Sequence, residues 1–186
     1  MNTNEDLLYN LKGRIFIQGL GRNEEGVRFL EKAVEIDPSI PNLVALGYEL
    51  REIDLQKAKR VLEPLYTKES KNKDVAYCYA EILIREKEYE KAYDIIKKTL
   101  KLFHKDADLL VLQGYGYFQK EEYDKSIKSL KKGLKRNHSH PVYVLKTLAE
   151  AYLAKELPLQ AEKYIKQALR IDPENTEAQT LLGRLK

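Results

Sequence analysis

The sequence predicts an all-α fold, a solenoid of antiparallel helix pairs, because the chain repeats itself about every 34 residues. Residues 85–92, Arg-Glu-Lys-Glu-Tyr-Glu-Lys-Ala, align with residues 119–126, Gln-Lys-Glu-Glu-Tyr-Asp-Lys-Ser. Small residues recur in two columns, one holding Gly26, Ala58, Ala92, Ser126 and Ala161, the other Gly47, Ala80, Gly114, Ala149 and Gly183. Two helices approach closely only where a side chain is small, so the columns predict the crossing points.

Each repeat is expected to contain two amphipathic helices joined by a short turn. In residues 107–137 the apolar and small positions follow helical spacing in two stretches, interrupted at Glu121 and Glu122. The two acids fit the start of the second helix, where the helix dipole favours negative charge. The basic residues of that second helix are expected to point outward: Lys125, Lys128, Lys131, Lys132, Lys135 and Arg136.

The whole chain, residues 1–186, is predicted to form a single array. We place its repeats at residues 7–38, 39–72, 73–106, 107–141 and 142–175, followed by a capping helix at 176–186. A terminal helix of this kind would cover the exposed end of the stack. The end of the sequence also leaves open that the chain is part of a longer array.

Five of the six prolines agree with this map. Pro38 and Pro173 follow predicted second helices, because proline cannot continue a helix. Pro41, Pro141 and Pro158 fall in predicted first turns, where the missing N–H is tolerated.

Pro64 is the exception, since it falls inside a predicted second helix. An interior proline costs about 3 kcal/mol and kinks or stops a helix. We therefore expect a bend or an early end near Glu63, and an altered packing angle towards residues 73–86.

The repeat resembles the tetratricopeptide repeat family. The resemblance rests on a Leu-Gly-like pair in each first helix, on aromatics at two positions and on a second small position, and it covers essentially the whole chain. The residues that carry it are Leu46-Gly47, Tyr79-Ala80, Gln113-Gly114, Leu148-Ala149, Leu182-Gly183, Tyr117, Tyr152, Tyr89, Tyr123, Ala33, Gly133 and Ala168. Tryptophan is absent, and His104 and His138 stand where a closing proline is typical. The resemblance implies a right-handed superhelix whose first helices line a concave groove.

Composition favours a cytoplasmic protein. The 186 residues carry a net charge of +4 and a single cysteine, which excludes an internal disulfide and fits a reducing compartment. The chain has no apolar run long enough to span a bilayer, and its N-terminal residues do not resemble a secretory signal.

No catalytic, cofactor or metal site is predicted, so we expect a protein that is not an enzyme. Cys78 is interpreted as a small packing residue. His138 and His140 are a weak metal pair without further ligands, and a solvated turn is the favoured interpretation. The excess of lysine on second helices is interpreted as a solvated face, and nucleic-acid binding is disfavoured because no aromatics lie among those lysines.

The first helices carry the predicted site. Helical spacing from the small column places on their groove side Tyr48, Asp74, Tyr77, Glu81, Asp108, Val111, Tyr115, Phe118, Tyr143, Lys146 and Glu150. Aromatic residues dominate binding hot spots, although some of these could instead pack between repeats. The predicted function is a scaffold or adaptor that binds a peptide or helix of another protein. The alternative is self-assembly through Leu181, Leu182 and Leu185 of the last helix.

Overall fold

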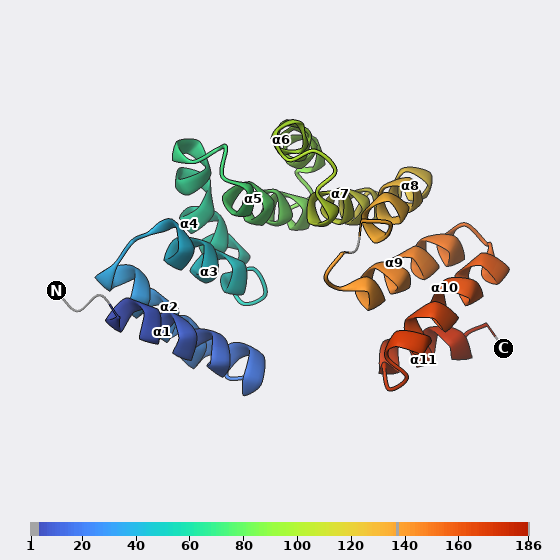
Figure 1. Ribbon diagram of the computed structural model, residues 1–186, viewed down its shortest axis with the longest axis horizontal. Helices are drawn as coiled ribbons and strands as arrows, with labels where there is room; N and C mark the ends of the chain where they lie inside the picture. The colour runs from blue at the N-terminus through green and yellow to red at the C-terminus, as the bar shows by residue number, and fades with distance from the viewer. Residues whose placement is uncertain (1–3, 137, 186) are drawn as a thin grey trace. The chain divides into compact units, whose positions relative to one another are not determined.

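The computed structural model describes residues 4–136 and 138–185, and all regular structure in these residues is helical (Figure 1). In chain order the helices are α1 (Glu5–Arg14) with the π-helical turn η1 (Ile15–Gly19), α2 (Asn23–Ile36), α3 (Ile40–Leu50), α4 (Leu55–Lys68), α5 (Lys73–Arg85), α6 (Tyr89–Leu102), α7 (Ala107–Gln119), α8 (Tyr123–Leu134), α9 (Pro141–Ala154), α10 (Pro158–Ile171) and α11 (Thr176–Gly183). The predicted all-α fold class is confirmed.

The chain divides into two compact units. The first unit, residues 1–86, holds α1 to α5, and the second unit, residues 87–186, holds α6 to α11. The division falls between α5 and α6, inside the segment 73–106 that the sequence assigns to one repeat. The division of the chain into five repeats therefore stays a proposal.

Helix boundaries follow local chemistry. Asp54, Asn72, Asp106 and Asn175 cap helices by accepting hydrogen bonds from backbone N–H groups of the first turn. Pro41, Pro141 and Pro158 lie in the first turns of α3, α9 and α10, as predicted. Helices α2 and α10 end two residues before Pro38 and Pro173, also as predicted.

The early end predicted near Glu63 is wrong, because α4 continues through Pro64 to Lys68. Leu65 is buried beyond the proline, and the ring of Tyr66 packs against Tyr79 of α5 with centroids 5.3 Å apart. These contacts hold the last turn in place. The bend near Glu63 and the altered packing angle towards residues 73–86 stay predictions.

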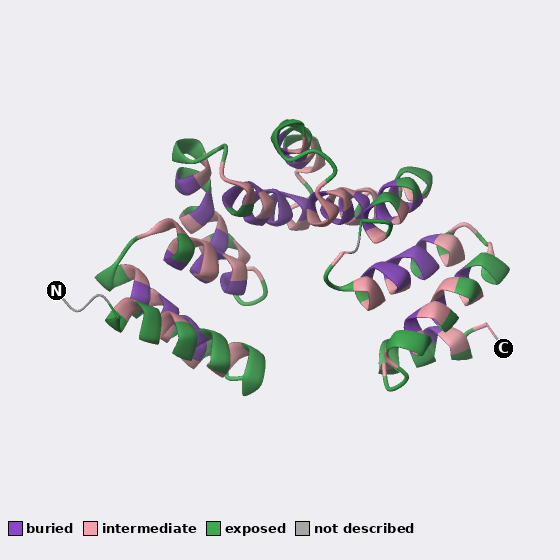
Figure 2. Ribbon diagram, in the orientation of Figure 1, coloured by how far each residue is buried: buried purple, intermediate pink, exposed green. Residues whose placement is uncertain are grey.

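The small-residue columns mark the tightest helix crossings. A Cβ on Gly47 would lie 2.5 Å from Leu62 Cγ, and one on Gly114 would lie 2.6 Å from Leu130 Cγ. The alanines of both columns are fully buried within the helix layers, whose buried positions are purple in Figure 2. Gly13 extends the second column towards the N-terminus, since a Cβ there would lie 2.8 Å from the Gly26 carbonyl oxygen.

The terminal helix α11 packs into the second unit. Ala178 and Leu181 belong to a buried cluster with Ile165 of α10, and Leu182 and Leu185 pack against it. The apolar side of the last helix is therefore largely used by the core.

Candidate functional site

First helices lie side by side in the first unit. Gln18 Nε2 of η1 donates to Glu49 Oε1 of α3 over 2.8 Å. Arg51 Nε, just after α3, donates to Glu81 Oε1 of α5 over 3.0 Å. These bonds join α1 with η1 to α3, and α3 to α5, so the first helices form one row.

The second unit has the same kind of row. The rings of Tyr115 on α7 and Tyr143 on α9 lie with centroids 6.3 Å apart. Lys146 of α9 forms an ion pair with Glu177 of α11. The helices α7, α9 and α11 are thus linked in order through side chains on their first-helix positions.

We use the name first-helix surface for the predicted site residues and the arginines beside them, separately in each unit. In the first unit it consists of Tyr48, Arg51, Asp74, Tyr77, Glu81 and Arg85. In the second unit it consists of Asp108, Tyr115, Phe118, Tyr143, Lys146 and Glu150.

Glu81 is the most buried charge of this surface, with 8% of its area exposed. Its Oε1 accepts from Arg51 Nε, while Arg85 Nη2 lies 3.4 Å from the same oxygen. Within the described residues its Oε2 is buried and has no hydrogen-bond partner. A buried acceptor without a partner is costly, so Glu81 holds one unsatisfied acceptor atom at this position.

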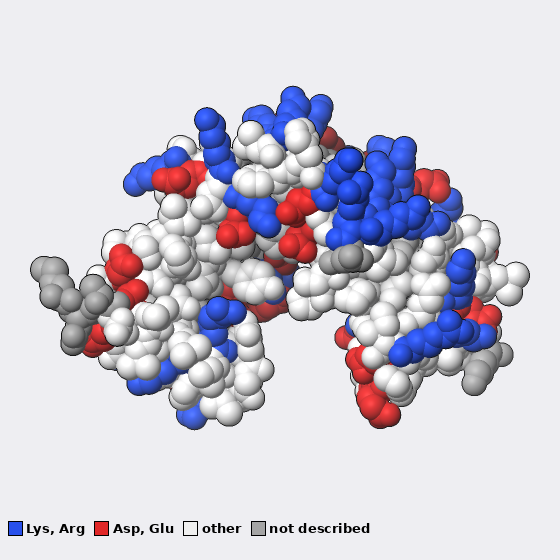
Figure 3. Space-filling model, viewed as in Figure 1, with Lys and Arg blue, Asp and Glu red and all other residues white. Residues whose placement is uncertain are grey.

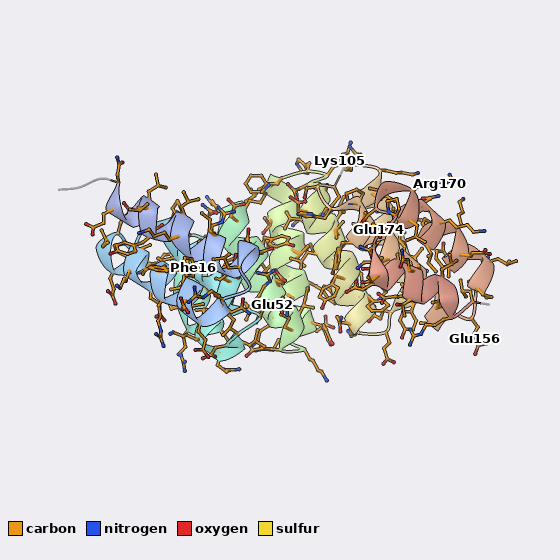
Figure 4. The ribbon with its side chains drawn as sticks, turned by 90° about the horizontal axis from the view of Figure 1, so that it is seen from below. Phe16, Glu52, Lys105, Glu156, Arg170 and Glu174 are labelled. Atoms are coloured by element: carbon orange, nitrogen blue, oxygen red, sulfur yellow. The ribbon has the colours of Figure 1, made fainter. Side chains whose placement is uncertain are left out.

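The arginines around Glu81 are held in place. The Arg51 guanidinium carbon lies 3.4 Å from the centroid of the Tyr48 ring, a cation–π contact. Burial raises the pKa of the Tyr48 hydroxyl, an effect that Arg51 opposes. Arg85 donates from both terminal nitrogens to the carboxylate of Glu52, labelled in Figure 4, over 2.5 and 3.1 Å.

The aromatic residues of the second unit are not equivalent. Tyr143 is exposed and Tyr115 is half-buried beside it. Phe118 instead packs against Tyr123 at 5.9 Å and against a buried cluster of α7, α8 and α9. The Tyr115–Tyr143 pair is therefore the accessible aromatic feature of this surface.

Val111 does not belong to the surface, which corrects the prediction. Only 3% of its area is exposed, because its side chain fills the space beside Gly133 of α8. Gly133 could have indicated this from the sequence, since a glycine on one helix leaves space that a larger side chain of the facing helix fills. Glu81 is buried as well, while the other predicted residues are half-buried or, like Asp74, Tyr143 and Glu150, exposed.

His138 is not a solvated turn residue, which corrects a second interpretation. Its side chain is 7% exposed, and its Nε2 lies 3.2 Å from Asp108 Oδ1. Its Nδ1 accepts from the backbone N–H of His140 over 3.0 Å, so the neutral ring can donate to Asp108 through Nε2. Burial lowers the pKa of His138, and Asp108 opposes this.

Cys78 is a packing residue, as predicted. It is buried in α5, and burial raises its pKa to about 12, which keeps the thiol protonated and unreactive. In the described part of the chain, no three His, Cys, Asp or Glu side chains gather as they would to hold a metal ion.

The basic side of α8 has two kinds of lysine. Lys128, Lys132, Lys135 and Arg136 are exposed, and Figure 3 shows Lys and Arg side chains gathered where α8 lies in Figure 1. Lys131 differs from the expectation that every basic residue of this helix points outward, because its side chain is half-buried.

Lys131 instead lies over two aromatic rings. Its Nζ is 5.3 Å from the Tyr152 centroid and 5.8 Å from the Tyr164 centroid, and it donates to the Tyr152 hydroxyl over 2.6 Å. These two rings stack on each other with an interplanar angle of 8°. The lysine thus joins α8 to α9 and α10.

Among residues 4–136 and 138–185, no helix combines the length and the apolar character that crossing a membrane requires.

Comparison with known proteins agrees with the repeat architecture. The family described as tetratricopeptide repeat matches residues 7–40 and 147–175, and the family described as anaphase-promoting complex, cyclosome, subunit 3 matches residues 52–133. No curated protein sequence matches the chain.

Solved structures share the fold. A thermophilic TPR protein of Thermus thermophilus is 20% identical with a TM-score of 0.84, covering 97% of this chain and 98% of its own. MamA (41-end) of Desulfovibrio magneticus RS-1 is 17% identical with a TM-score of 0.65, covering 95% and 99%. The APC/C hetero-tetramer Cut9-Hcn1 gives 17% identity and a TM-score of 0.66, covering 99% of this chain and 43% of that one. The solved structures show the shared fold, and the tetratricopeptide repeat model at both ends of the chain, together with the two columns of small residues, shows that the chain belongs to the tetratricopeptide repeat family.

Proposed function

We propose that this protein is a non-enzymatic scaffold or adaptor that binds a peptide or helix segment of another protein along its first helices. The observation that carries the proposal is the Tyr115–Tyr143 pair, which places two aromatic rings at an accessible position on adjacent first helices. Accessible aromatics on a preorganised surface supply binding energy at little ordering cost.

The first unit adds a chemical preference. Glu81 places a carboxylate with one buried, unpaired oxygen in the first-helix surface, and Asp74 on the same helix is exposed. A segment that offers a lysine or arginine next to apolar residues fits this surface, because the exposed Asp74 carboxylate can form a charge-assisted hydrogen bond with the cation. The proposal needs no cofactor, metal or small-molecule substrate.

The test is affinity capture from source-cell lysate with the wild-type chain and with the variant Tyr115→Ala/Tyr143→Ala. We expect the variant to bind the captured protein about ten to a hundred times more weakly, since removing hot-spot aromatics costs on the order of 1–3 kcal/mol. The matched control is Phe103→Ala, an exposed aromatic after α6 that is not on a first helix. Equal affinity of the Tyr115/Tyr143 variant and the wild type, with both correctly folded, would overturn the proposal.

The alternatives now differ in support. Self-assembly through Leu181, Leu182 and Leu185 is not favoured, because these side chains pack into the second unit. Nucleic-acid binding through exposed α8 lysines would require affinity that falls steeply with salt, as counterion release demands. Retained partner affinity at high salt argues against it.

A further inference from the structure

The N-terminal helix exposes a continuous apolar row. The row consists of Leu7, Leu8, Leu11 and Ile15, which are 64, 49, 55 and 50% exposed. In contrast to the last helix, α1 leaves its largest aliphatic side chains in water. Exposed apolar patches of this kind mark interaction sites more often than chance.

The row occupies one side of α1, away from its partners in the fold. Its spacing of three, four and eight residues is that of a single helix face. The opposite face carries Gly13, which is buried against Leu30 of α2. Asn10 Nδ2 donates to Asn42 Oδ1 over 2.7 Å, so the side of α1 that carries Asn10 faces α3. The apolar row is therefore left without cover by either α2 or α3.

Ile15, the last residue of the row, is the first residue of the turn η1. Leu20 N donates to Ile15 O over 3.2 Å, and this bond spans five residues, as in a π-helix. Gln18 of the same turn donates to Glu49 of α3, and η1 follows directly on α1. The row and the contact with α3 thus lie on consecutive residues of α1 and η1.

Charge along α1 is self-complementary. The first turn carries Glu5 and Asp6, and the last turn carries Lys12 and Arg14. Glu5 and Lys12 are seven residues, about two turns, apart, so both flank the row on one side. Within the described residues Lys12 forms no ion pair, and its Nζ lies 5.8 Å from the Tyr9 ring centroid.

We propose that the apolar row of α1 is a self-association surface, covered by α1 of a second copy running antiparallel. In that arrangement about a two-fold axis, the acidic start of each helix lies beside the basic end of the other, with Glu5 of one copy near Lys12 of its partner. Leu8 and Leu11 of each copy lie at the centre. Antiparallel packing also opposes the two helix dipoles favourably.

The interface is small, so the dimer is reversible. A single helix face from each copy buries less than the roughly 1,200 Å² of total area typical of stable complexes. Association therefore depends on protein concentration in the micromolar range or above. The row uses neither Tyr115 nor Tyr143. A result that overturns self-association therefore leaves the proposed partner binding untouched, and the reverse also holds.

The experiment is sedimentation velocity of the full chain over a wide concentration range. We expect the wild type to shift from monomer to dimer, and Leu8→Gln/Leu11→Gln to weaken association at least about tenfold. Both positions are exposed, so the fold should persist, which circular dichroism checks. The matched control is Leu159→Gln, because Leu159 on α10 is 79% exposed and lies off the row.

A charge exchange tests the antiparallel arrangement. Glu5→Lys and Lys12→Glu should each weaken the dimer, and the double variant should restore it, because both copies then carry the exchanged pair. A wild type that stays monomeric at all concentrations overturns the proposal. So does a dimer that survives Leu8→Gln/Leu11→Gln, or a double exchange no stronger than the single ones. A row variant that loses a different captured protein while the wild type stays monomeric assigns the surface to that partner instead.

Discussion

At the residue scale, four charged residues adopt a backbone conformation that favours glycine, and one of them is Lys105, with φ of 66°, between α6 and α7. Lys87, Glu121 and Glu156 have φ values of 63°, 63° and 57° at the turn that follows a first helix. Gly21, with φ of 64°, takes the same conformation after η1. Glu156 lies in the α9–α10 turn (Figure 4). The left-handed residue ends the helix, and a side chain there is strained.

Glu121→Gly is expected to raise the free energy of unfolding by about 0.5–1 kcal/mol, because glycine adopts positive φ without steric cost. The side chain is exposed, so little packing is lost. Urea unfolding followed by circular dichroism measures the change. The control Gln119→Gly places glycine in the last turn of α7 and should lower stability; an equal effect of both substitutions would contradict the role of φ.

His138 links stability to pH. Its folded-state pKa is lowered from 6.5 by burial, with Asp108 and Asp106 opposing the shift and His140 adding to it by its charge. Because the unfolded chain binds the proton more readily, stability is fully present above pH 6.5. It is lost as the pH falls from 6.5 towards the folded-state pKa.

We therefore expect the free energy of unfolding to fall on acidification below pH 6.5, with a slope from this group of no more than about 1.4 kcal/mol per pH unit. Urea unfolding between pH 7.5 and 5.5 measures it. His138→Gln should flatten the profile, while His140→Gln, at an exposed position, should leave most of it. A wild-type profile without a slope in this range would refute the assignment.

At the element scale, two glycines of the same small-residue column differ in the space around them. Gly114 faces Leu130, whose Cγ and backbone N would lie 2.6 and 3.0 Å from a new Cβ. Gly183 has nothing within 4 Å of the same point, since no second helix follows α11 in the described chain. The repeat pattern is the same, but the packing partner is missing.

Gly114→Ala is expected to destabilise the protein by about 1–3 kcal/mol, because Leu130 is fully buried and the α7–α8 pair must separate. Gly183→Ala should be neutral or slightly stabilising, since alanine favours helix and meets no obstacle. Thermal unfolding of the two variants compares them directly. Similar loss at both positions would show that helix contact is not the cause.

Pro64 shows how packing overrides a local preference. An interior proline removes one hydrogen bond, yet α4 runs on to Lys68. Tyr79 of α5 donates from its hydroxyl to Glu63 over 2.8 Å and packs against Tyr66, so both sides of the proline are held. The cost of the proline is offset by contacts that exist only once α5 is in place.

At the scale of the whole molecule, stability comes from neighbouring elements in sequence. Ion pairs and ring contacts join each first helix to the next one within a unit, as Arg51–Glu81 and Tyr115–Tyr143 do. Such an array is a sum of local interfaces. Its described ends differ, because α11 uses its apolar side in the core and α1 does not.

The sequence by itself determined the fold class, the crossing points and most helix boundaries. These features depend on periodic small residues, prolines and capping groups, which act over a few neighbouring positions. The first-helix rows could also be predicted, because helical spacing decides which residues share a face.

Tertiary structure alone decided which of those residues are accessible. Val111 is core because Gly133 lies on the next helix, and Lys131 is held because two tyrosines stack beneath it. Burial of His138 and exposure of the α1 row likewise depend on what packs opposite each residue. That information is not periodic, since it is set by the shape of the neighbouring helix, and so no repeat pattern contains it.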